Sequence, residues 1–371
     1  FEDYGLFTQV EQLNKTALKA HGLDKSGHLY KVNSFDFRRY EDTIKLADDP
    51  DYNQANFEGM LEIKGDSDHT KLIEMLEALN DDTQKIDDVL DTYFDTENLV
   101  YWLAFQLLTG NCDTQNRNCY LYSPLNSNTW YILDWDNDGM LRKLELSLTG
   151  FSDYASWERG VSNYWGNVLF NRAMRSKSFR SELDRAVKDL RSYMTEARLA
   201  KMIKHYREVT ESLVFASPDI DNLPVTKDQY EQIAAAIPSE IEENYKSYCE
   251  SYKKPMPFYI GVPQIDNGKL RINWDASYDF KARDIRYTVE LARDYAISDV
   301  LFKAEDVLLP EVTCDAPDAG QYFVRVRATN SDGYTQDAFD YYVTDDGKHY
   351  GMKCFYVQDG GKVVEDTYEE G

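Results

Sequence analysis

The chain has 371 residues, of which 42% are hydrophobic and 29% charged, and its formal net charge is −25. This composition is typical of a folded protein with two or more domains, and it excludes a long disordered chain. So negative a surface repels nucleic-acid phosphates and anionic lipid, and no apolar run is long enough to span a bilayer. We therefore expect neither nucleic-acid binding nor a membrane span.

The first part of the chain predicts short strands and helices. Residues 4–10 mix aromatic and branched side chains as a strand does, and residues 28–32 predict another short strand. Residues 71–79 carry apolar side chains at helical spacing. Residues 97–109 are apolar on most sides, so this segment predicts a buried helix, which Gly110 is placed to end.

Two short strands, residues 119–122 and 129–133, are predicted after the polar segment that follows this helix. Residues 163–253 are predicted to be helical, with prolines between the helices. Beyond Pro255 the hydrophobic pattern changes from helical spacing to strict alternation, which predicts strands. We therefore place a domain boundary between residues 254 and 255.

Alternating apolar residues, among them Leu270, Ile272 and Trp274, mark the strands of the C-terminal region. Turn sequences separate them, so we expect an antiparallel sandwich of about seven or eight strands with a buried Trp274. The WDAS and GQYFVRVRATNSDG runs resemble a fibronectin type III module, an immunoglobulin-like sandwich, over residues 255–346. Residues 347–371 predict one more strand and an acidic tail.

The segment richest in side chains suited to chemistry is residues 111–145, directly after the predicted buried helix. Asp113 precedes Asn118 by five positions, the offset between the base and the metal-binding Asn in the catalytic loop of protein kinases. Asp136 and Asp138 follow a predicted strand, where kinases place the Asp that binds Mg²⁺. A short loop of this kind aims a carboxylate at a substrate hydroxyl and an amide oxygen at a cation.

A set of motifs in this order resembles the CotH kinase family. The motifs are YGLFTQVEQ, GHLYK, a helix ending in GN-x-D, N-x-Y-L-Y and W-x-x-x-x-W-D-x-D. The resemblance implies an atypical kinase fold. It also implies ATP- and Mg²⁺-dependent phosphoryl transfer to Ser or Thr of a protein substrate.

The resemblance also implies roles for individual residues. Asp113 matches the catalytic aspartate of the family, and Asn118 matches the metal ligand of the loop. Asp136 matches the metal-binding aspartate that follows the hairpin, and Asp138 matches the second acid of the same motif.

Glu11 and Lys31 match family positions that we assign to nucleotide contact or to packing between the lobes. The chain departs from the family pattern at two places. We expect the N-terminal lobe of the family, with its phosphate-gripping lysine, to precede Tyr4 and to be missing from this chain. We expect nucleotide binding to be weak without this lobe. Asp134 stands where the family usually has proline.

Asp134 also raises an alternative, a calcium site. Together with Asp136, Asp138, Gly139 and Glu145 it fits the pattern D-x-D-x-D-G-x₅-E of an EF-hand loop. A strand rather than a helix is predicted before this loop, and its ninth position is an arginine, which disfavours calcium. A kinase-like Mg²⁺ site, a structural Ca²⁺ loop and a purely structural acidic turn stay open at this point.

We expect an α+β protein with a kinase-like domain at residues 1–254, rich in helices, a sandwich at residues 255–346, and a further strand and tail at residues 347–371. The alternative to a kinase is a non-catalytic scaffold or carbohydrate-associated adhesion protein with a structural calcium site. The 28 tyrosines and the fibronectin-like module favour that alternative. The module would then bind a carbohydrate or another surface partner. Under both hypotheses we expect a secreted or cell-surface location.

Overall fold

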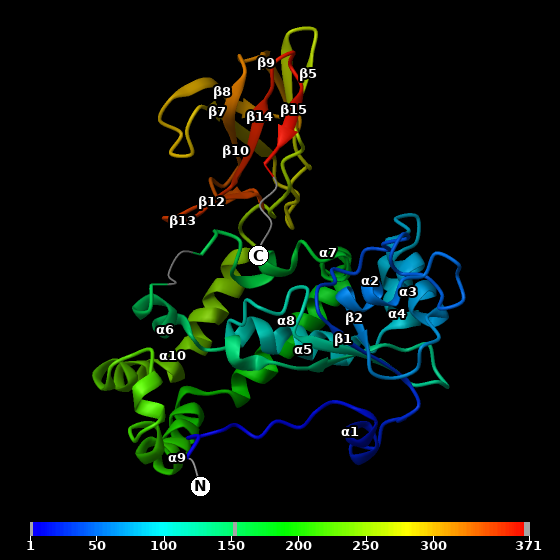
Figure 1. Cartoon of the computed structure of the whole chain (residues 1–371), viewed down its shortest axis with the longest axis vertical. Helices are drawn as coiled ribbons and strands as arrows, with labels where there is room; N and C mark the ends of the chain where they lie inside the picture. The colour runs from blue at the N-terminus through cyan, green and yellow to red at the C-terminus, as the bar shows by residue number, and fades with distance from the viewer. Residues whose placement is uncertain (1–2, 151–153, 367–371) are drawn as a thin grey trace. The chain divides into compact units, whose positions relative to one another are not determined.

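The computed structural model describes residues 3–150 and 154–366, and the chain divides into two compact units. The first unit comprises residues 1–152 and 167–246, and the second comprises residues 153–166 and 247–371. Helices prevail in the first unit and antiparallel strands in the second (Figure 1). This mixture of helices and sheets confirms the predicted α+β class.

A four-stranded antiparallel sheet in the order β2-β1-β3-β4 organises the first unit. Its strands are β1 (His28–Val32), β2 (Leu61–Ile63), β3 (Cys119–Ser123) and β4 (Tyr131–Asp134). β3 and β4 form a hairpin in which Cys119 pairs with Asp134, and Val32 pairs with Cys119 on the other side. The chain enters and leaves the hairpin at this row, so Asn118 and Asp136 both lie just beyond it.

The faces and the edge of this sheet have different neighbours, because successive strand residues point to opposite sides. On one face Tyr120 and Tyr122 form a cluster with Leu18 of α1 (Lys15–Ala20). The free edge of β4 pairs with α5 (Thr96–Thr109) through Asn98. The Asn98 side chain accepts a hydrogen bond from the N–H of Ile132 at 2.8 Å and donates one to the Ile132 carbonyl at 3.1 Å.

α5 is the buried helix that the sequence predicts. Asp95 caps its first turn by accepting a hydrogen bond from the N–H of Asn98 at 2.8 Å. Gly110 ends it in the left-handed region with φ of 65°, and a Cβ there would lie 2.6 Å from Nδ2 of Asn244. Leu103 and Leu108 are fully buried. α5 is therefore a rigid base for the polar segment that follows it.

Further helices complete the first unit. They are α2 (Gln54–Met60), α3 (Thr70–Asn80), α4 (Ile86–Tyr93), η1 (Asn137–Gly139), α6 (Lys143–Leu148), α7 (Val168–Arg175), α8 (Lys177–Tyr193), α9 (Glu196–Val214), η3 (Asp219–Asn222) and the greater part of α10 (Lys227–Ser251). Trp102 of α5 stacks on Phe170 of α7 with ring centroids 5.6 Å apart. Leu169 and Met174 of α7 are also fully buried, so helix packing beside α5 forms much of this core.

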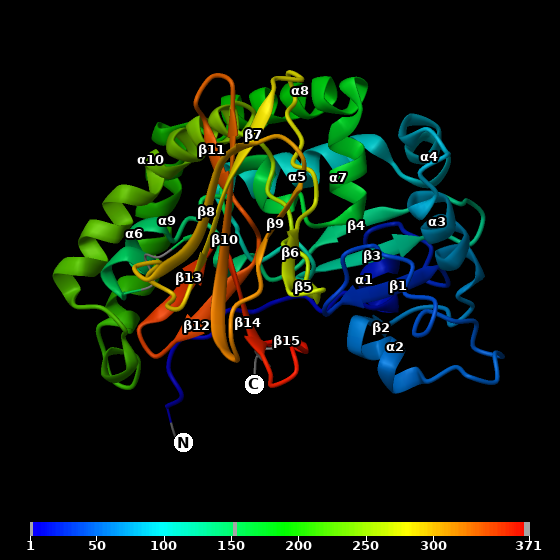
Figure 2. The same ribbon diagram turned by 90° about the horizontal axis from the view of Figure 1, so that it is seen from above.

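The second unit contains η2 (Gly160–Tyr164) and a series of strands. The strands are β5 (Gln264–Asp266), β6 (Lys269–Asn273), β7 (Ile285–Ala292), β8 (Val300–Val307), β9 (Glu311–Asp315), β10 (Gly320–Asn330), β11 (Thr335–Asp337), β12 (Tyr341–Thr344), β13 (Gly347–Tyr350), β14 (Met352–Val357) and β15 (Val363–Glu365). One sheet has the order β15-β14-β10-β7-β8 with β11 beside β10, and another has the order β5-β6-β9. Figure 2 shows β7, β8 and β10 as long neighbouring strands.

The two larger sheets of the second unit share one apolar core. Ile272 of β6 belongs to the same buried cluster as Val289 of β7 and Val324 of β10. Trp274 is 4% exposed and lies in this cluster, which confirms that it is buried. The described residues of this C-terminal stretch, from 258 to 366, form strands, turns and loops without a helix.

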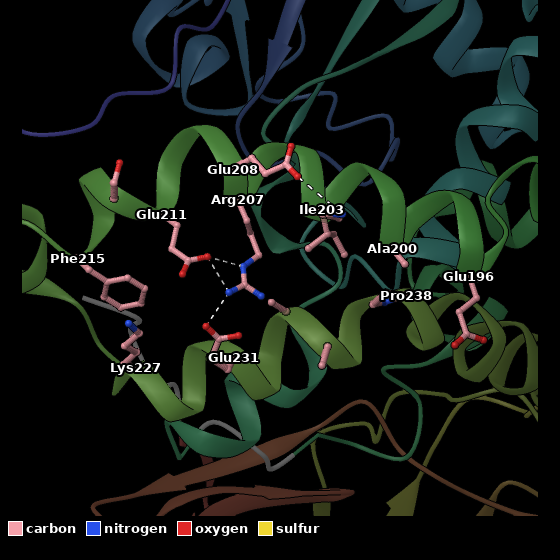
Figure 3. Close-up of a pocket in the computed structure, with 14 residues that line it drawn as sticks. Glu196, Ala200, Ile203, Arg207, Glu208, Glu211, Phe215, Lys227, Glu231 and Pro238 are labelled. Atoms are coloured by element: carbon pink, nitrogen blue, oxygen red, sulfur yellow. Dashed lines mark hydrogen bonds and ion pairs between the residues drawn. The ribbon is translucent and has the colours of Figure 1, made fainter.

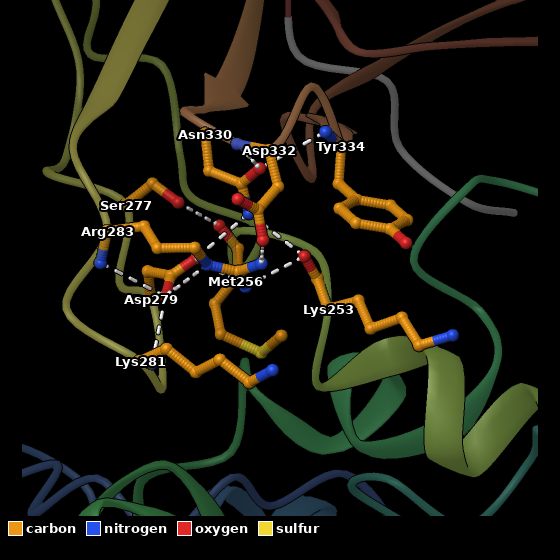
Figure 4. Close-up of polar contacts among 9 residues, drawn as sticks. All are labelled: Lys253, Met256, Ser277, Asp279, Lys281, Arg283, Asn330, Asp332 and Tyr334. Carbon is orange, nitrogen blue, oxygen red and sulfur yellow. Dashed lines mark hydrogen bonds and ion pairs between the residues drawn. The ribbon is translucent and has the colours of Figure 1, made fainter.

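Within the second unit, a buried polar network joins Lys253, just after α10, to two loops (Figure 4). The Asp279 carboxylate accepts hydrogen bonds from Arg283 and from Asn330, and its side chain is only 1% exposed. Arg283 and Asn330 also each donate to the carbonyl of Lys253 at 2.9 Å. Burial raises the pKa of Asp279, but these hydrogen bonds outweigh it and hold the pKa below its usual value.

Two details differ from the sequence-based expectations. The predicted strand at residues 4–10 is wrong: the segment has no regular structure, and the N–H of Leu6 bonds to the Asp219 carboxylate at 3.1 Å. Beyond residue 346 the chain forms not one strand but β13, β14 and β15, and β14 lies between β10 and β15 in the larger sheet. Residues 367–371 of the predicted acidic tail lie outside the described residues, and the predicted domain ranges stay predictions.

Candidate functional site

The first component of the candidate site is the loop between α5 and β3. Asn111 is buried, and its Oδ1 accepts a hydrogen bond from the N–H of Asp113 at 3.2 Å. The Nδ2 of Asn118 donates to the Asp113 carboxylate at 2.8 Å and to the Asp113 carbonyl at 3.1 Å. Because two acceptors face this NH₂ group, the Oδ1 of Asn118 lies on the other side of the amide. An amide oxygen is a hard donor of the kind that Mg²⁺ takes as a ligand.

The second component is the acidic turn after β4. Because Cys119 pairs with Asp134 in the hairpin, this turn lies at the same end of the hairpin as Asn118. Gly139 in this turn lies against the first loop: a Cβ added to it would be 2.6 Å from the Oδ1 of Asn111 and 3.6 Å from the Cβ of Asp113. The structure therefore brings the segments of Asp113, Asn118 and Asp136 side by side. That the Asp113 and Asp136 carboxylates face one cleft stays a prediction.

Two candidate ligands share an unusual backbone conformation. Asn118 has φ of 58° and Asp136 has φ of 57°, both in the left-handed region. Asn and Asp tolerate this region better than other residues with a Cβ, but it is still less stable than ordinary backbone. Such conformations gather at functional sites, where the surrounding structure holds them in place.

Asp134 belongs to different surroundings from Asp136. It is the last residue of β4, and its carboxylate accepts a hydrogen bond from Nε2 of Gln106 at 2.9 Å. Desolvation raises its pKa, against hydrogen bonds from Gln106 and Trp102 that lower it, although the residue is exposed. Glu145 is held by Arg142 in a two-point ion pair of 2.8 and 2.9 Å.

Lys31 and Glu11 occupy separate places. The Nζ of Lys31 lies 5.8 Å from the ring centroid of Trp135, the residue before Asp136, so Lys31 is near the acidic turn. The Trp135 ring also meets the Tyr120 ring edge-on at 5.4 Å. Glu11 is exposed and pairs with Nε2 of His21 at 2.8 Å. The structure thus places Lys31 near the acidic turn, and it pairs Glu11 with His21 at the C-terminal end of α1.

The donor set fits magnesium better than a metal that needs a full protein cage. Within residues 3–150 and 154–366, no three Asp, Glu, His or Cys side chains gather closely enough to hold a metal ion. A kinase-type Mg²⁺ site does not need such a group, because phosphate oxygens and water complete its octahedron and one ligand is an Asn amide. Asp136 and Asp138 are exposed carboxylates in the turn beside Asn118, and hard oxygen donors of this kind suit Mg²⁺.

Sequence reasoning missed the residues that hold the two segments together. Gln106, Asn111 and Gly139 make these contacts. Gln106 had one detectable signal, since it is a polar residue in a helix that is otherwise apolar on most sides. The closeness of Gly139 to Asn111 has no sequence signal, because it depends on how the hairpin packs on α5.

A groove of about 780 Å³ lies elsewhere in the first unit, between α9 and α10 (Figure 3). Arg207 of α9 crosses it and pairs with Glu211 on the same helix and with Glu231 on α10, both at 2.7 Å. None of the six residues predicted to form the site lines this groove.

The comparisons with known proteins identify the family. A family model described as CotH kinase protein matches residues 2–248, more than half of the chain, so the chain belongs to the CotH kinase family. No curated protein sequence matches the chain. None of the helices formed by the described residues is long and apolar enough to cross a membrane.

One similar solved structure is the twitchin kinase region from C. elegans (Fn31-NL-kin-CRD-Ig26). It is 19% identical, and the similarity covers 26% of this chain and 20% of that chain with a TM-score of 0.20. This chain therefore spans about a fifth of that structure, and so small a likeness supports no further inference.

Proposed function

We propose that this chain is an atypical protein kinase that transfers the γ-phosphoryl group of ATP, with Mg²⁺, to Ser or Thr of a protein substrate. The observation that carries the proposal is the contact of Asn118 with Asp113 beside the turn of Asp136, in a chain of the CotH kinase family. A carboxylate base, an amide oxygen and an acidic turn are the parts that a phosphoryl-transfer site requires.

In this proposal Asp113 is the catalytic residue. Its exposed carboxylate accepts the proton of the substrate hydroxyl as the hydroxyl oxygen bonds to the γ-phosphorus, and the bond from that phosphorus to the bridging oxygen of ADP breaks. Asn118 orients the Asp113 carboxylate from one side with its Nδ2. Its Oδ1 and the carboxylates of Asp136 and Asp138 hold Mg²⁺, which when bound neutralises charge on the phosphates.

Lys31 is proposed to contact the nucleotide phosphates. Its ammonium group lies 5.8 Å from the centroid of the Trp135 ring, and Trp135 directly precedes Asp136. In the sheet Lys31 pairs with Tyr120 of β3, two residues after Asn118. Glu11, on the exposed segment before α1, pairs with His21 at the C-terminal end of that helix, and its role in nucleotide contact or in packing between the lobes stays a prediction.

The engagement of Asp134 with Gln106 and of Glu145 with Arg142 favours the kinase-type site over a calcium loop. An EF-hand loop requires the first and twelfth positions as ligands, and here both carboxylates have other partners. Residues 255–346, which lie in the second unit, are proposed to form a fibronectin type III-like module. Two antiparallel sheets with one shared core and a buried Trp274 support that proposal. A carbohydrate or surface partner and a secreted location stay predictions.

The test is a phosphoryl-transfer assay with radiolabelled ATP, Mg²⁺ and a Ser- and Thr-rich acceptor protein. We expect the wild-type chain to label the acceptor. The rate of transfer by Asp113→Asn should be at least about a hundredfold lower, since a positioned base contributes roughly 10²–10⁴-fold to the rate. Asp332→Asn, a change of an exposed carboxylate in the second unit, is the control and should keep the activity. Equal labelling by the wild type and Asp113→Asn would refute the assigned base, and no labelling at all would favour the scaffold alternative.

A further inference from the structure

Gln106 bonds to both components of the candidate site. Its backbone carbonyl accepts the N–H of Gly110, which ends α5, and the N–H of Asn111 at 3.1 Å, so it anchors the start of the Asp113 loop. Its side-chain Nε2 donates to the Oδ1 of Asp134 at 2.9 Å and to the Oδ1 of Asn137 at 3.4 Å, so it anchors the acidic turn. Asn137 lies directly between Asp136 and Asp138.

Two further contacts attach the same turn to the end of α5. The N–H of Leu141 donates to the carbonyl of Thr109 at 2.9 Å. The close approach of Gly139 to the Oδ1 of Asn111 leaves no room for a Cβ. These contacts fix the far side of the turn. The side chain of Gln106 is the one among them that reaches the residues on either side of Asp136.

Gln106 occupies a buried position that is unusual for an amide side chain. It is 1% exposed, in a helix whose other buried residues are mostly apolar, where a leucine would serve the packing equally well. Burying an amide is unfavourable unless hydrogen bonds compensate. The bonds to Asp134 and Asn137 compensate the Nε2 of this amide, whereas its Oε1 is buried without a hydrogen-bond partner among the described residues. The unpaired oxygen is a cost that a leucine would avoid, and the amide provides the two bonds to the turn in return.

We propose that Gln106 is a positioning residue that fixes the acidic turn of Asp136 relative to the loop of Asp113. This inference rests on the proposed kinase function for its catalytic consequence, although its structural part stands on the contacts alone. A base and a metal ligand on separate segments must be held in register, because a displacement of about 1 Å in such sites reduces rates by about a hundredfold.

The experiment compares Gln106→Leu and Gln106→Glu with the wild-type full-length chain. Leucine keeps the approximate volume and loses the amide, whereas glutamate keeps the shape and loses the donor. The matched control is Gln336→Leu in β11, because Gln336 is also 1% exposed and donates its Nε2 to Ser156 at 2.8 Å in the second unit.

The first measurement is hydrogen exchange across residues 134–141, followed by mass spectrometry. We expect exchange in this segment to accelerate at least about tenfold in both Gln106 variants, which corresponds to about 1.4 kcal/mol of local stability. In Gln336→Leu the exchange should stay at the wild-type rate. An unchanged rate in both Gln106 variants overturns the inference, whatever the activity.

The second measurement is kcat and KM for phosphoryl transfer from ATP. We expect kcat to fall about tenfold to a hundredfold in both Gln106 variants, with KM for ATP within about threefold of the wild type. Gln336→Leu should keep kcat even where its melting temperature falls. A kcat in Gln106→Glu equal to the wild type overturns the inference. If the wild type transfers no phosphate, the proposed function fails, and hydrogen exchange alone decides on the positioning.

Discussion

Asn118 holds Asp113 at two atoms: its Nδ2 lies 2.8 Å from the Asp113 carboxylate and 3.1 Å from the Asp113 carbonyl. The contact fixes both the backbone and the side chain of the proposed base. Asn118 makes it from the left-handed region, with φ of 58°. In the proposed function the same residue orients the base and would hold the metal with its remaining oxygen.

This relationship predicts different effects for two substitutions of Asn118. Asn118→Gly and Asn118→Ala both remove the amide, so both should lower phosphoryl transfer. Alanine keeps a Cβ on the left-handed backbone and glycine removes it, so Asn118→Ala should be less stable than Asn118→Gly by about 1 kcal/mol. Urea unfolding measures the difference. At Asn126, which is not among the positive-φ residues, the order should reverse. Equal stability of the two Asn118 variants would show that the left-handed conformation is not maintained.

Asp134 separates the magnesium proposal from the calcium alternative. Asp134→Asn keeps an acceptor for Gln106 and removes the charge of a carboxylate whose pKa is raised by desolvation, although Asp134 is an exposed residue. We therefore expect its free energy of unfolding at pH 7 to equal or exceed that of the wild type. Ca²⁺ alone should not raise the melting temperature of either protein. A Ca²⁺-dependent rise in the wild type that Asp134→Asn abolishes would support the calcium loop instead.

Two buried histidines predict a loss of stability in mild acid. Burial lowers the pKa of His28, with a smaller effect of Lys71, and burial also lowers the pKa of His69. Below the unfolded value of about 6.5 the unfolded chain takes up protons that the folded chain does not. The free energy of unfolding should therefore fall as the pH drops below about 6.5, by up to about 1.4 kcal/mol per pH unit for each imidazole.

The pH dependence can be assigned with one variant. His28→Phe keeps a ring beside Trp130, whose centroid lies 6.0 Å from that of His28, and removes one titrating group. Urea unfolding between pH 7.5 and 5.5 should then show that the free energy of unfolding of this variant depends less steeply on pH than that of the wild type. If the free energy of unfolding depends on pH as steeply as in the wild type, His28 does not contribute to the pH dependence.

The network in Figure 4 predicts unequal effects for two aspartates that share one arginine. Asp279 and Asp332 both pair with Arg283, at 2.8 and 2.7 Å, but the Asp279 side chain is 1% exposed and the Asp332 side chain 55%. Asp279→Ala leaves buried donors without an acceptor and should cost about 3–5 kcal/mol. Asp332→Ala should cost less than about 1 kcal/mol. Calorimetric unfolding of both variants checks this, and equal losses would contradict the role given to burial.

The elements with strong local signals could be predicted from the sequence. The buried helix at residues 97–109 corresponds to α5, its end at Gly110 is confirmed, and residues 71–79 correspond to α3. Their apolar spacing and end signals are local, so a single segment contains the information. The predicted strand at residues 4–10 is wrong, because its aromatic and branched side chains are largely exposed and its backbone bonds to Asp219 instead.

The pairing of distant segments could not be predicted from local patterns. The order β2-β1-β3-β4 places β1 beside β3, although many residues separate them in the chain. The placement of β14 between β10 and β15 likewise depends on packing over the whole sheet. In the candidate site, motif spacing indicated Asp113, Asn118 and Asp136. The support from Gln106 could not be inferred, because it depends on the hairpin returning along the end of α5.

The most direct test of the central claim is calorimetric titration of Mg²⁺·ATP into the wild type, Asp136→Asn and Asp134→Asn. The two variants change neighbouring carboxylates of one segment by the same chemistry, and only Asp136 lies in the turn beside Asn118. The account predicts binding to the wild type and to Asp134→Asn with similar affinity, and at least about tenfold weaker binding to Asp136→Asn. Wild-type affinity in Asp136→Asn, or the loss of binding in Asp134→Asn instead, would contradict it.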